Sequence, residues 1–215
     1  MADKHEWRKE EKAIYLPKAE PVCLTIPAFH YITIKGEGSP DEERFASCIG
    51  ALYPLAYTIK MQLKKLADKP KGYQDYTVYP LEGIWDINEE ARKNFTGKIR
   101  KEDLVYCLML RQPDFITRDF FDEMKELVRS KLLKKKESTA FVDLLAFESI
   151  DEGKCVQMLH VGKFADEDKT FNIMEAYARN KGLTRISKIH REIYLSDFRK
   201  VAPEKLKTTL RFQVH

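Results

Sequence analysis

The sequence lacks any uninterrupted apolar stretch long enough to span a bilayer, and its charged N-terminus is not followed by an apolar signal region. We therefore expect neither membrane insertion nor secretion, and we predict a cytoplasmic protein. Cysteine is also sparse. The four cysteines are far apart, without the CxxC or CxxH spacing of a zinc site, and they indicate reduced, mostly buried thiols: Cys23, Cys48, Cys107 and Cys155. No metal site and no cofactor is predicted.

A large surplus of one charge is absent as well. The 215 residues carry 38 Lys and Arg against 34 Asp and Glu, which leaves a net charge of +4 on a densely mixed surface. This balance predicts solubility and no direct nucleic-acid partner. The sequence has no Walker loop, no Rossmann glycine fingerprint and no serine in a nucleophile elbow, which disfavours those nucleotide-binding and hydrolase classes. The hydrophobic fraction of 43% is enough for one large domain or two halves with a shared core.

The first half of the sequence has the pattern of strands, a helix and more strands. After a polar lead-in, residues 1–20, a β-branched segment over 21–35 is interrupted at Pro27. Ser39-Pro40-Asp41-Glu42 has the composition of a capping box and predicts a helix that begins there and ends near Ala67. Strands are expected over 76–87 and 104–112.

The second half repeats this order after a linking helix that begins at Thr117 and a strand over 141–149. A strand over 155–161, a helix from Asp166 to Gly182, and strands over 186–195 and 206–214 follow. We predict an α+β fold with two βαββ repeats, about 21–115 and 150–215, joined by residues 117–149. Such repeats form an antiparallel sheet with helices on one side, and a ligand cleft lies between the two halves.

The most informative residue is Glu192, in the middle of the predicted strand 186–195. At the two-residue period of a strand, His190, Glu192 and Tyr194 share one face. The opposite face is the apolar one and is expected to be a core face, with Ile189, Ile193 and Leu195. In the first half the counterpart of Glu192 is Glu82.

Two interpretations of Glu192 remain open. In the first, Glu192 is an ordinary glutamate, either at the surface or paired with Arg191 or Arg211. In the second, it is an anion at the floor of an aromatic cleft. Burial in such a cleft would raise its pKa and suit it to acid–base chemistry near neutral pH. Candidate ligand-binding side chains lie near both glutamate strands and elsewhere, although each equally fits a core: Trp85, Tyr79, Tyr53, Tyr57, Met109, Phe147, His160, His190 and Phe212.

Segments 80–85, 152–162, 190–197 and 203–211 together resemble the GyrI-like (gyrase-inhibitor-like) small-molecule-binding domains. This resemblance covers nearly the whole chain and implies duplicated βαββ units related by an SHS2-type pseudo-two-fold. In the multidrug-sensing regulators of the family, the glutamate that matches Glu192 binds cationic aromatic drugs. The sequence has no helix-turn-helix segment before the domain, which disfavours a one-chain transcription regulator.

Stand-alone members of similar length resemble cyclopropanoid cyclopropyl hydrolases, which open the cyclopropane of yatakemycin-type DNA-alkylating compounds. The resemblance implies a planar aromatic small molecule as the partner, cellular protection as the outcome, and Glu192, Tyr194 and Glu82 as catalytic candidates. Phe164 stands where another member has tyrosine. The alternatives are a non-catalytic binder or sensor of cationic aromatic drugs, and a gyrase-interacting protein that no sequence feature favours. The sequence gives no oligomeric state.

Overall fold

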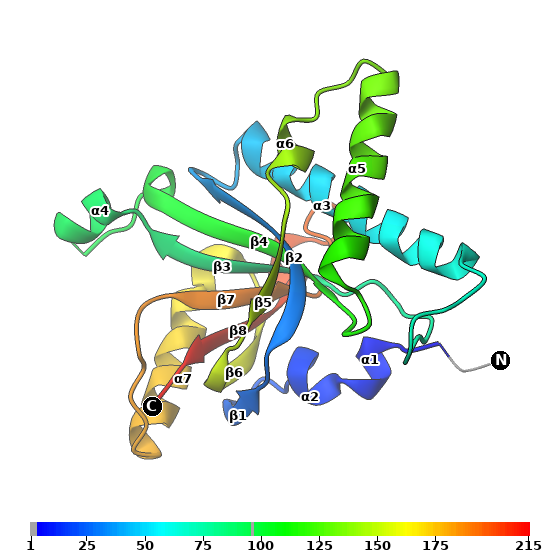
Figure 1. Ribbon diagram of the computed structural model, residues 1–215. Coiled ribbons are helices and arrows are strands. Elements are labelled where there is room, and N and C mark those ends of the chain that lie inside the picture. The colour runs from blue at the N-terminus through cyan, green and yellow to red at the C-terminus, as the bar shows by residue number, and fades with distance from the viewer. Residues whose placement is uncertain (1–3, 96) are drawn as a thin grey trace. The chain divides into compact units, whose positions relative to one another are not determined.

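A computed structural model of the chain describes residues 4–95 and 97–215 (Figure 1). The chain forms two compact units, and each unit is built from several separate segments of the sequence. Unit 1 consists of residues 4–6, Phe29–Tyr79 and Ile87–Ile150, and unit 2 of Trp7–Ala28, Pro80–Asp86 and Asp151–His215. Residues 1–3 of the predicted lead-in lie outside the described residues.

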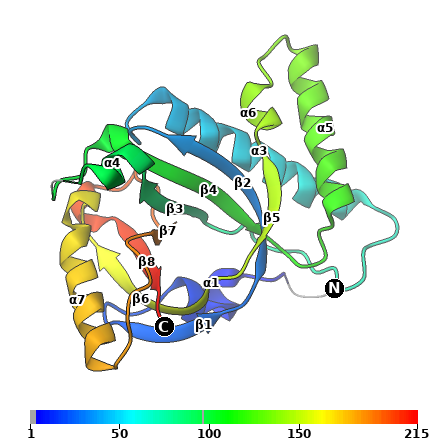
Figure 2. The same cartoon turned by 60° about the vertical axis from the view of Figure 1, so that its left-hand side comes forward.

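Unit 1 is an antiparallel sheet covered by helices. Its strands run in the order β4-β2-β5, and α3 packs on β2 and β4 while α5 and α6 pack on α3 (Figures 1 and 2). Its elements are β2 (Phe29–Glu37), α3 (Glu43–Lys65), α4 (Glu89–Lys93), the 3-10 helix η1 (Lys101–Asp103), β4 (Leu104–Gln112), α5 (Arg118–Lys134), α6 (Ala140–Asp143) and β5 (Ala146–Ile150).

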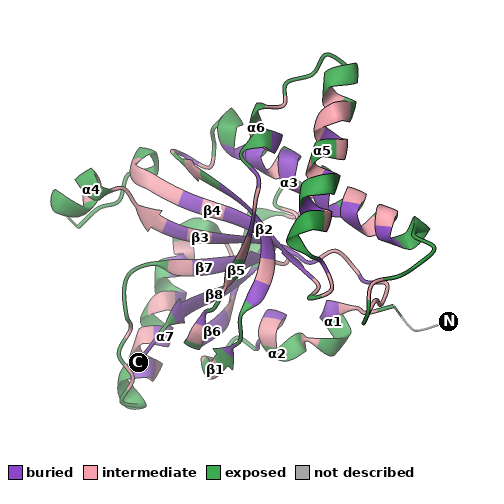
Figure 3. Cartoon of the chain, viewed as in Figure 1, coloured by how far each residue is buried: buried purple, intermediate pink, exposed green. Residues whose placement is uncertain are grey.

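Helix α3 buries an apolar stripe that includes Phe45, Leu52, Ile59 and Leu63. Figure 3 colours the ribbon of each element by the burial of its residues. The start of the helix differs from the prediction. Ser39 Oγ accepts from the Asp41 amide and the Glu42 carboxylate accepts from the Ser39 amide, both at 3.2 Å, but these bonds close a turn before the helix. The helix itself begins at Glu43. The predicted cap on α5 is confirmed, because Thr117 Oγ1 accepts from the Phe120 amide.

One glycine in β2 is required by close packing. A Cβ atom on Gly36 would lie 2.5 Å from the ring of Tyr106, its cross-strand neighbour on β4. We expect Gly36→Ala to lower the free energy of unfolding by about 1–3 kcal/mol, because the buried ring has to move. Gly50→Ala, in α3 with no atom within 4 Å of the new methyl, is the matched control and should stabilise by about 1 kcal/mol. Urea denaturation of both variants tests this, and equal effects would contradict it.

Within unit 2 the strands are antiparallel and run in the order β1-β6-β8-β7-β3. Helix α7 packs on β6, so the sheet has one face turned toward a helix. Its elements are α1 (Trp7–Glu10), α2 (Lys12–Tyr15), β1 (Val22–Ile26), β3 (Leu81–Ile87), β6 (Gly153–Val161), the 3-10 helix η2 (Phe164–Asp166), α7 (Glu167–Asn180), β7 (His190–Tyr194), the 3-10 helix η3 (Pro203–Lys205) and β8 (Lys207–Gln213). Both units bear out the predicted α+β class.

The two faces of the unit 2 strands differ in chemistry. The face under α7 carries a hydrophobic cluster of Val156, Met158, Met174, Ala178, Leu210, Phe212 and Val214. The opposite face carries a buried network of charges. Glu152 accepts from Arg211 at 2.7 Å and lies 3.1 Å from Arg191, and Arg191 also donates to Glu82 at 2.7 Å. Arg211 further bonds Gln157 and the carbonyl of Ile14 in α2.

The described part of the polar lead-in forms the short helices α1 and α2 and buries two aromatic side chains. Trp7 is 2% and Tyr15 1% exposed, and their rings meet edge to face at 5.3 Å. These two aromatic side chains bury large apolar areas, which outweighs the charge of the residues around them. Beyond them, Thr209 Oγ1 donates to the carbonyl of Tyr15, so that α2 lies against the sheet of unit 2.

Several predicted strands are shorter in the structure. The segment 76–87 forms a strand only from Leu81, because Pro80 has no amide hydrogen to donate to a ladder. Of segment 141–149, the first residues form α6 and the strand begins at Ala146. Segment 186–195 is a strand only over His190–Tyr194, which leaves Ile189 41% exposed and not in a core.

Cys48 and Cys155 are buried, Cys23 and Cys107 are partly buried, and none of these four described residues forms a disulfide. Over the residues that are described, none of the helices combines the length and apolarity needed to cross a membrane.

Candidate functional site

Glu192 lies in the centre of β7, on the sheet face that α7 covers. Its cross-strand neighbours are Gly83 on β3 and Leu210 on β8. Gly83 has no side chain, so the position opposite the carboxylate on that strand is unfilled, and glycine in a strand often marks such an approach. Glu192 is 8% exposed. The structure therefore supports the interpretation of Glu192 as a buried anion over that of a surface glutamate.

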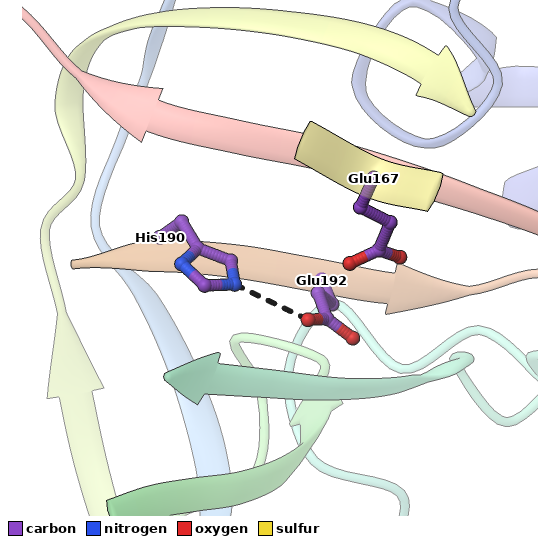
Figure 4. Close-up of side chains that lie close together, drawn as sticks. All are labelled: Glu167, His190 and Glu192. Carbon is purple, nitrogen blue, oxygen red and sulfur yellow. Dashed lines mark hydrogen bonds and ion pairs between the residues drawn. The ribbon is translucent and has the colours of Figure 1, made fainter. Parts of the chain in front are cut away.

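A second buried carboxylate, Glu167, points at Glu192 from the first turn of α7 (Figure 4). Glu167 is 7% exposed, and its Oε1 atom is buried without a hydrogen-bond partner. Burial raises the pKa of Glu167 well above its usual range, and the adjacent Glu192 carboxylate raises it further. The physical cause is that two adjacent carboxylates cannot both be ionised cheaply away from water. Glu167 therefore retains its proton well above pH 4.5, the ordinary value of its pKa.

His190 lies beside this pair of carboxylates. Its Nε2 atom is 3.2 Å from Glu192 Oε1, and its Nδ1 atom is 3.3 Å from the carbonyl oxygen of Lys188. The ring also meets Phe171 of α7 edge to face at 4.8 Å. One ligand atom each from Glu167, His190 and Glu192 lies within 4.8 Å of the others, so these three residues could hold a metal ion.

Tyr194 and Trp85 complete the surroundings of Glu192. The indole Nε1 of Trp85 donates to the hydroxyl of Tyr194 at 2.8 Å, and that hydroxyl is hydrogen-bonded to Glu192. Burial, followed by the negative charge of Glu192, raises the pKa of Tyr194 well above its usual range. The phenol therefore stays neutral and donates to the carboxylate. Phe164, 41% exposed, meets the Tyr194 ring edge to face at 6.0 Å.

This arrangement combines a proton donor and a proton acceptor among aromatic rings. Protonated Glu167 is an acid, and Glu192, held by Tyr194 and His190, is a base for a water molecule or an anion for a cation. Among the described residues, no lysine or arginine forms an ion pair with either glutamate. The negative charge at this site is thus available to a ligand.

Glu82, predicted as a second acid, does not share this site. It lies opposite Ile193 in the β3–β7 ladder, one residue out of step with Glu192, so the two carboxylates point to opposite faces of the sheet. Glu82 pairs with Arg191 instead. The alternative in which Glu192 pairs with Arg191 or Arg211 is not seen in the structure, because both guanidinium groups lie on the Glu82 face with Glu152.

Two other candidates in unit 2 have structural roles. His160 is 4% exposed, and its ring nitrogens lie 2.8 Å from Thr170 Oγ1 and 3.0 Å from the carbonyl of Lys163. Phe212 is 1% exposed in the hydrophobic cluster under α7. Both are buried among their own neighbours, and their participation in ligand binding stays a prediction.

The remaining candidates belong to unit 1, where each is described by its own contacts. Tyr53 and Tyr57 both belong to α3, and their rings stack on each other with centroids 6.4 Å apart. Tyr57 is 52% exposed. Met109 is fully buried. Tyr79 lies under the guanidinium of Arg111, and the buried Phe147 stacks on Phe121 at 5.3 Å. Their participation in ligand binding stays a prediction.

Two surface pockets lie apart from the carboxylate pair. One, of about 380 Å³, includes Ile87, Phe95 and Ile99 in its lining, and the other, of about 340 Å³, lies at the C-terminal end of α7 near Leu183 and Lys188. Neither is lined by Glu192. The predicted ligand cleft between the halves is untested by these pockets and stays a prediction.

Sequence reasoning missed Glu167 and Phe171. Both lie on the first turns of α7, which the sequence presents as an acidic helix start followed by an apolar stripe. A signal was available, because Glu167 lies three and four residues before Thr170 and Phe171, on the buried side of the helix. An acidic residue on that side of a helix is unusual and indicates a partner in the core.

Residues 19–215 match the GyrI-like small molecule binding domain. Two solved structures of a hydrolase from Listeria innocua are 35% and 36% identical, with TM-scores of 0.83 and 0.85, and each comparison covers 99% of this chain and 100% of the other.

A more distant likeness is to the C-terminal domain of EcmrR, with a TM-score of 0.51 over 94% of this chain and 98% of the other. At 12% identity this likeness concerns the fold alone. No curated protein sequence matches the chain. Since the family match covers residues 19–215 and the hydrolase structures align over almost the entire sequence, the chain belongs to the GyrI-like small molecule binding domain family.

Proposed function

We propose that this protein is a hydrolase that opens the cyclopropane ring of planar aromatic DNA-alkylating compounds and so protects the cell. The observation that carries this proposal is the pair of buried carboxylates, Glu167 and Glu192, adjacent to each other among Trp85, Tyr194 and Phe171. The similarity to the Listeria innocua hydrolase supports an enzymatic role.

The reaction adds one water molecule to the strained ring. The water oxygen bonds the cyclopropane CH₂ carbon, the carbon–carbon bond to that carbon breaks, and its electron pair moves into the conjugated carbonyl. Glu192 takes a proton from the attacking water, and the resulting phenolate oxygen takes a proton from solvent, to which Glu192 later returns its own. No other reactant is needed, and ring strain supplies driving force.

Each group around Glu192 has a defined role in this scheme. Tyr194 donates to the Glu192 carboxylate and is itself oriented by Trp85, so the carboxylate is held in one orientation. Protonated Glu167 donates a hydrogen bond that positions the water against Glu192. The rings of Trp85 and Phe171 offer apolar surfaces to a planar compound.

We expect Glu192→Gln to lower turnover of a yatakemycin-type cyclopropane at least 100-fold, because the general base is lost while size and hydrogen bonding are kept. Chromatographic separation of the ring-opened product measures this. The matched control is Glu175→Gln, on the same helix as Glu167 but engaged by Arg185 at 2.8 Å, which should retain turnover. Turnover in Glu192→Gln equal to that of the unaltered chain would remove Glu192 from the mechanism.

A second function is favoured by one specific observation, the absence of a lysine or arginine partner for the two glutamates among the described ion pairs. A buried anion of this kind suits a cationic aromatic ligand, bound without being consumed. Incubation with a cationic dye in parallel with the cyclopropane compound separates the two functions. Retention of the dye with no loss of the cyclopropane would replace hydrolysis by binding.

A further inference from the structure

We propose that Glu167, His190 and Glu192 form a binding site for a divalent first-row transition metal ion. The proposal goes beyond small-molecule binding and does not rest on the hydrolysis, since metal binding is measured without any substrate. The three residues come from α7 and β7, and Figure 4 shows both carboxylates and the imidazole turned toward one point.

The spacing of the ligand atoms is close to that of a metal site. His190 Nε2 and Glu192 Oε1 are 3.2 Å apart. Two ligands of a tetrahedral zinc ion, each bound at about 2.0–2.2 Å, are separated by roughly 3.3–3.5 Å. A carboxylate oxygen of Glu167 lies within 4.8 Å of the other two ligand atoms. A side-chain adjustment of Glu167 toward them would close the set of three ligands.

The residues around this set match those that orient metal ligands. His190 Nδ1 faces the carbonyl oxygen of Lys188 at 3.3 Å, and a carbonyl can only accept. With the proton on Nδ1, Nε2 can present its lone pair to a metal ion that Glu192 also binds. Metal-binding histidines use the same arrangement, with the second ring nitrogen donating to a carbonyl or carboxylate. The Tyr194 hydroxyl fixes Glu192 in a corresponding way.

The charge of the site points to a cation as well. Glu167 and Glu192 are 7% and 8% exposed, and the described ion pairs offer them no lysine or arginine. Glu167 Oε1 is buried and has no hydrogen-bond donor. A buried carboxylate oxygen in this state needs a proton or a cation, and a divalent ion would neutralise both carboxylates together.

The donor set indicates which ions would bind. One imidazole nitrogen with two carboxylate oxygens suits Zn²⁺, Mn²⁺, Fe²⁺ or Co²⁺ and offers no thiolate for softer ions. Three protein ligands leave at least one coordination position open, as in catalytic zinc sites. Cys155, the buried thiol of the same unit, bonds the carbonyl of Glu152 and is not part of this set.

Titration of the metal-free, untagged full chain with Co²⁺ tests the proposal, with visible absorption reporting coordination and calorimetry reporting affinity. We expect one saturable site, and at least 100-fold weaker binding in Glu167→Gln and in His190→Ala. Glu175→Gln and His215→Ala, which alter an ion-paired glutamate and an exposed histidine, are the matched controls and should bind like the unaltered chain.

A thermal readout makes the result independent of spectroscopy. Zn²⁺ at about 100 times its dissociation constant should stabilise the unaltered chain by about 2.7 kcal/mol, and this gain should be absent in Glu167→Gln. Circular dichroism verifies that each variant is folded. Saturable cobalt binding that is unchanged in both site variants, or no binding by the unaltered chain at millimolar metal, would overturn the proposal.

Discussion

Replacing Glu152 by glutamine is expected to lower the free energy of unfolding by about 3–5 kcal/mol, the usual cost of removing one partner from a buried ion pair. Glu152 contacts both Arg211, at 2.7 Å, and Arg191, at 3.1 Å. Arg191 and Arg211 are 2% and 1% exposed. A neutral amide would remove the charge that both buried guanidinium groups contact, and that loss of compensation for buried charge is the source of the effect.

Urea or guanidinium denaturation measures this change, and the slope of the transition should stay the same. The control is Asp197→Asn, because Asp197 pairs with Arg199 and Lys200 at the surface, where water screens the charges and the stability should change little. If Glu152→Gln lost no more stability than this surface variant, the network would not be a structural element of unit 2.

The second large effect is a pH dependence of stability that arises from Glu167. Its pKa is raised in the folded protein, so the folded state holds the proton more tightly than the unfolded chain, whose pKa is near 4.5. The stabilisation is fully present below pH 4.5 and is lost as the pH rises through the folded pKa. Within that window stability should fall by up to about 1.4 kcal/mol per pH unit. Glu167→Gln, which cannot ionise, should lack this decline.

Denaturation curves of the unaltered chain and Glu167→Gln between pH 4.5 and 8 measure the effect, in chelator-treated samples. Glu175→Gln is the control with the opposite sign. Hydrogen bonds and charges from Lys188 and Arg185 outweigh burial and lower the pKa of Glu175, so its contribution is present above the unfolded pKa and is lost as the pH falls. Parallel pH profiles for the unaltered chain and Glu167→Gln would contradict the assignment of a buried proton to Glu167.

Much of the fold could be predicted from local pattern. The strand over 104–112 has the predicted bounds, and the break at Pro27 and the helix ended by Gly182 follow from the chemistry of those residues. A local stretch of sequence does not show which of its residues are buried by contacts with distant parts of the chain. Trp7 and Tyr15 lie among charged residues, yet their buried rings anchor a segment that composition presents as a tail.

Some features of the candidate site could also be predicted from the sequence, and others could not. The two-residue period of a strand placed His190, Glu192 and Tyr194 on one face, and the structure confirms that they lie together. The apparent equivalence of Glu82 and Glu192 was misleading, because strand register decides which face a residue occupies. A shift of one residue between β3 and β7 puts Glu82 with the arginines.

The sequence by itself determined the α+β class, the family likeness and the one-sided placement of Glu192, because these depend on periodicity and on short motifs. Only the tertiary structure decided that Glu192 is buried, that Arg191 and Arg211 turn away from it, and that Glu167 faces it. Glu167 and Glu192 are separated along the chain and come together because α7 packs over the sheet of unit 2. The electrostatic energy and the pKa of an ionisable group depend on what surrounds it in space, and only the packed structure defines those surroundings.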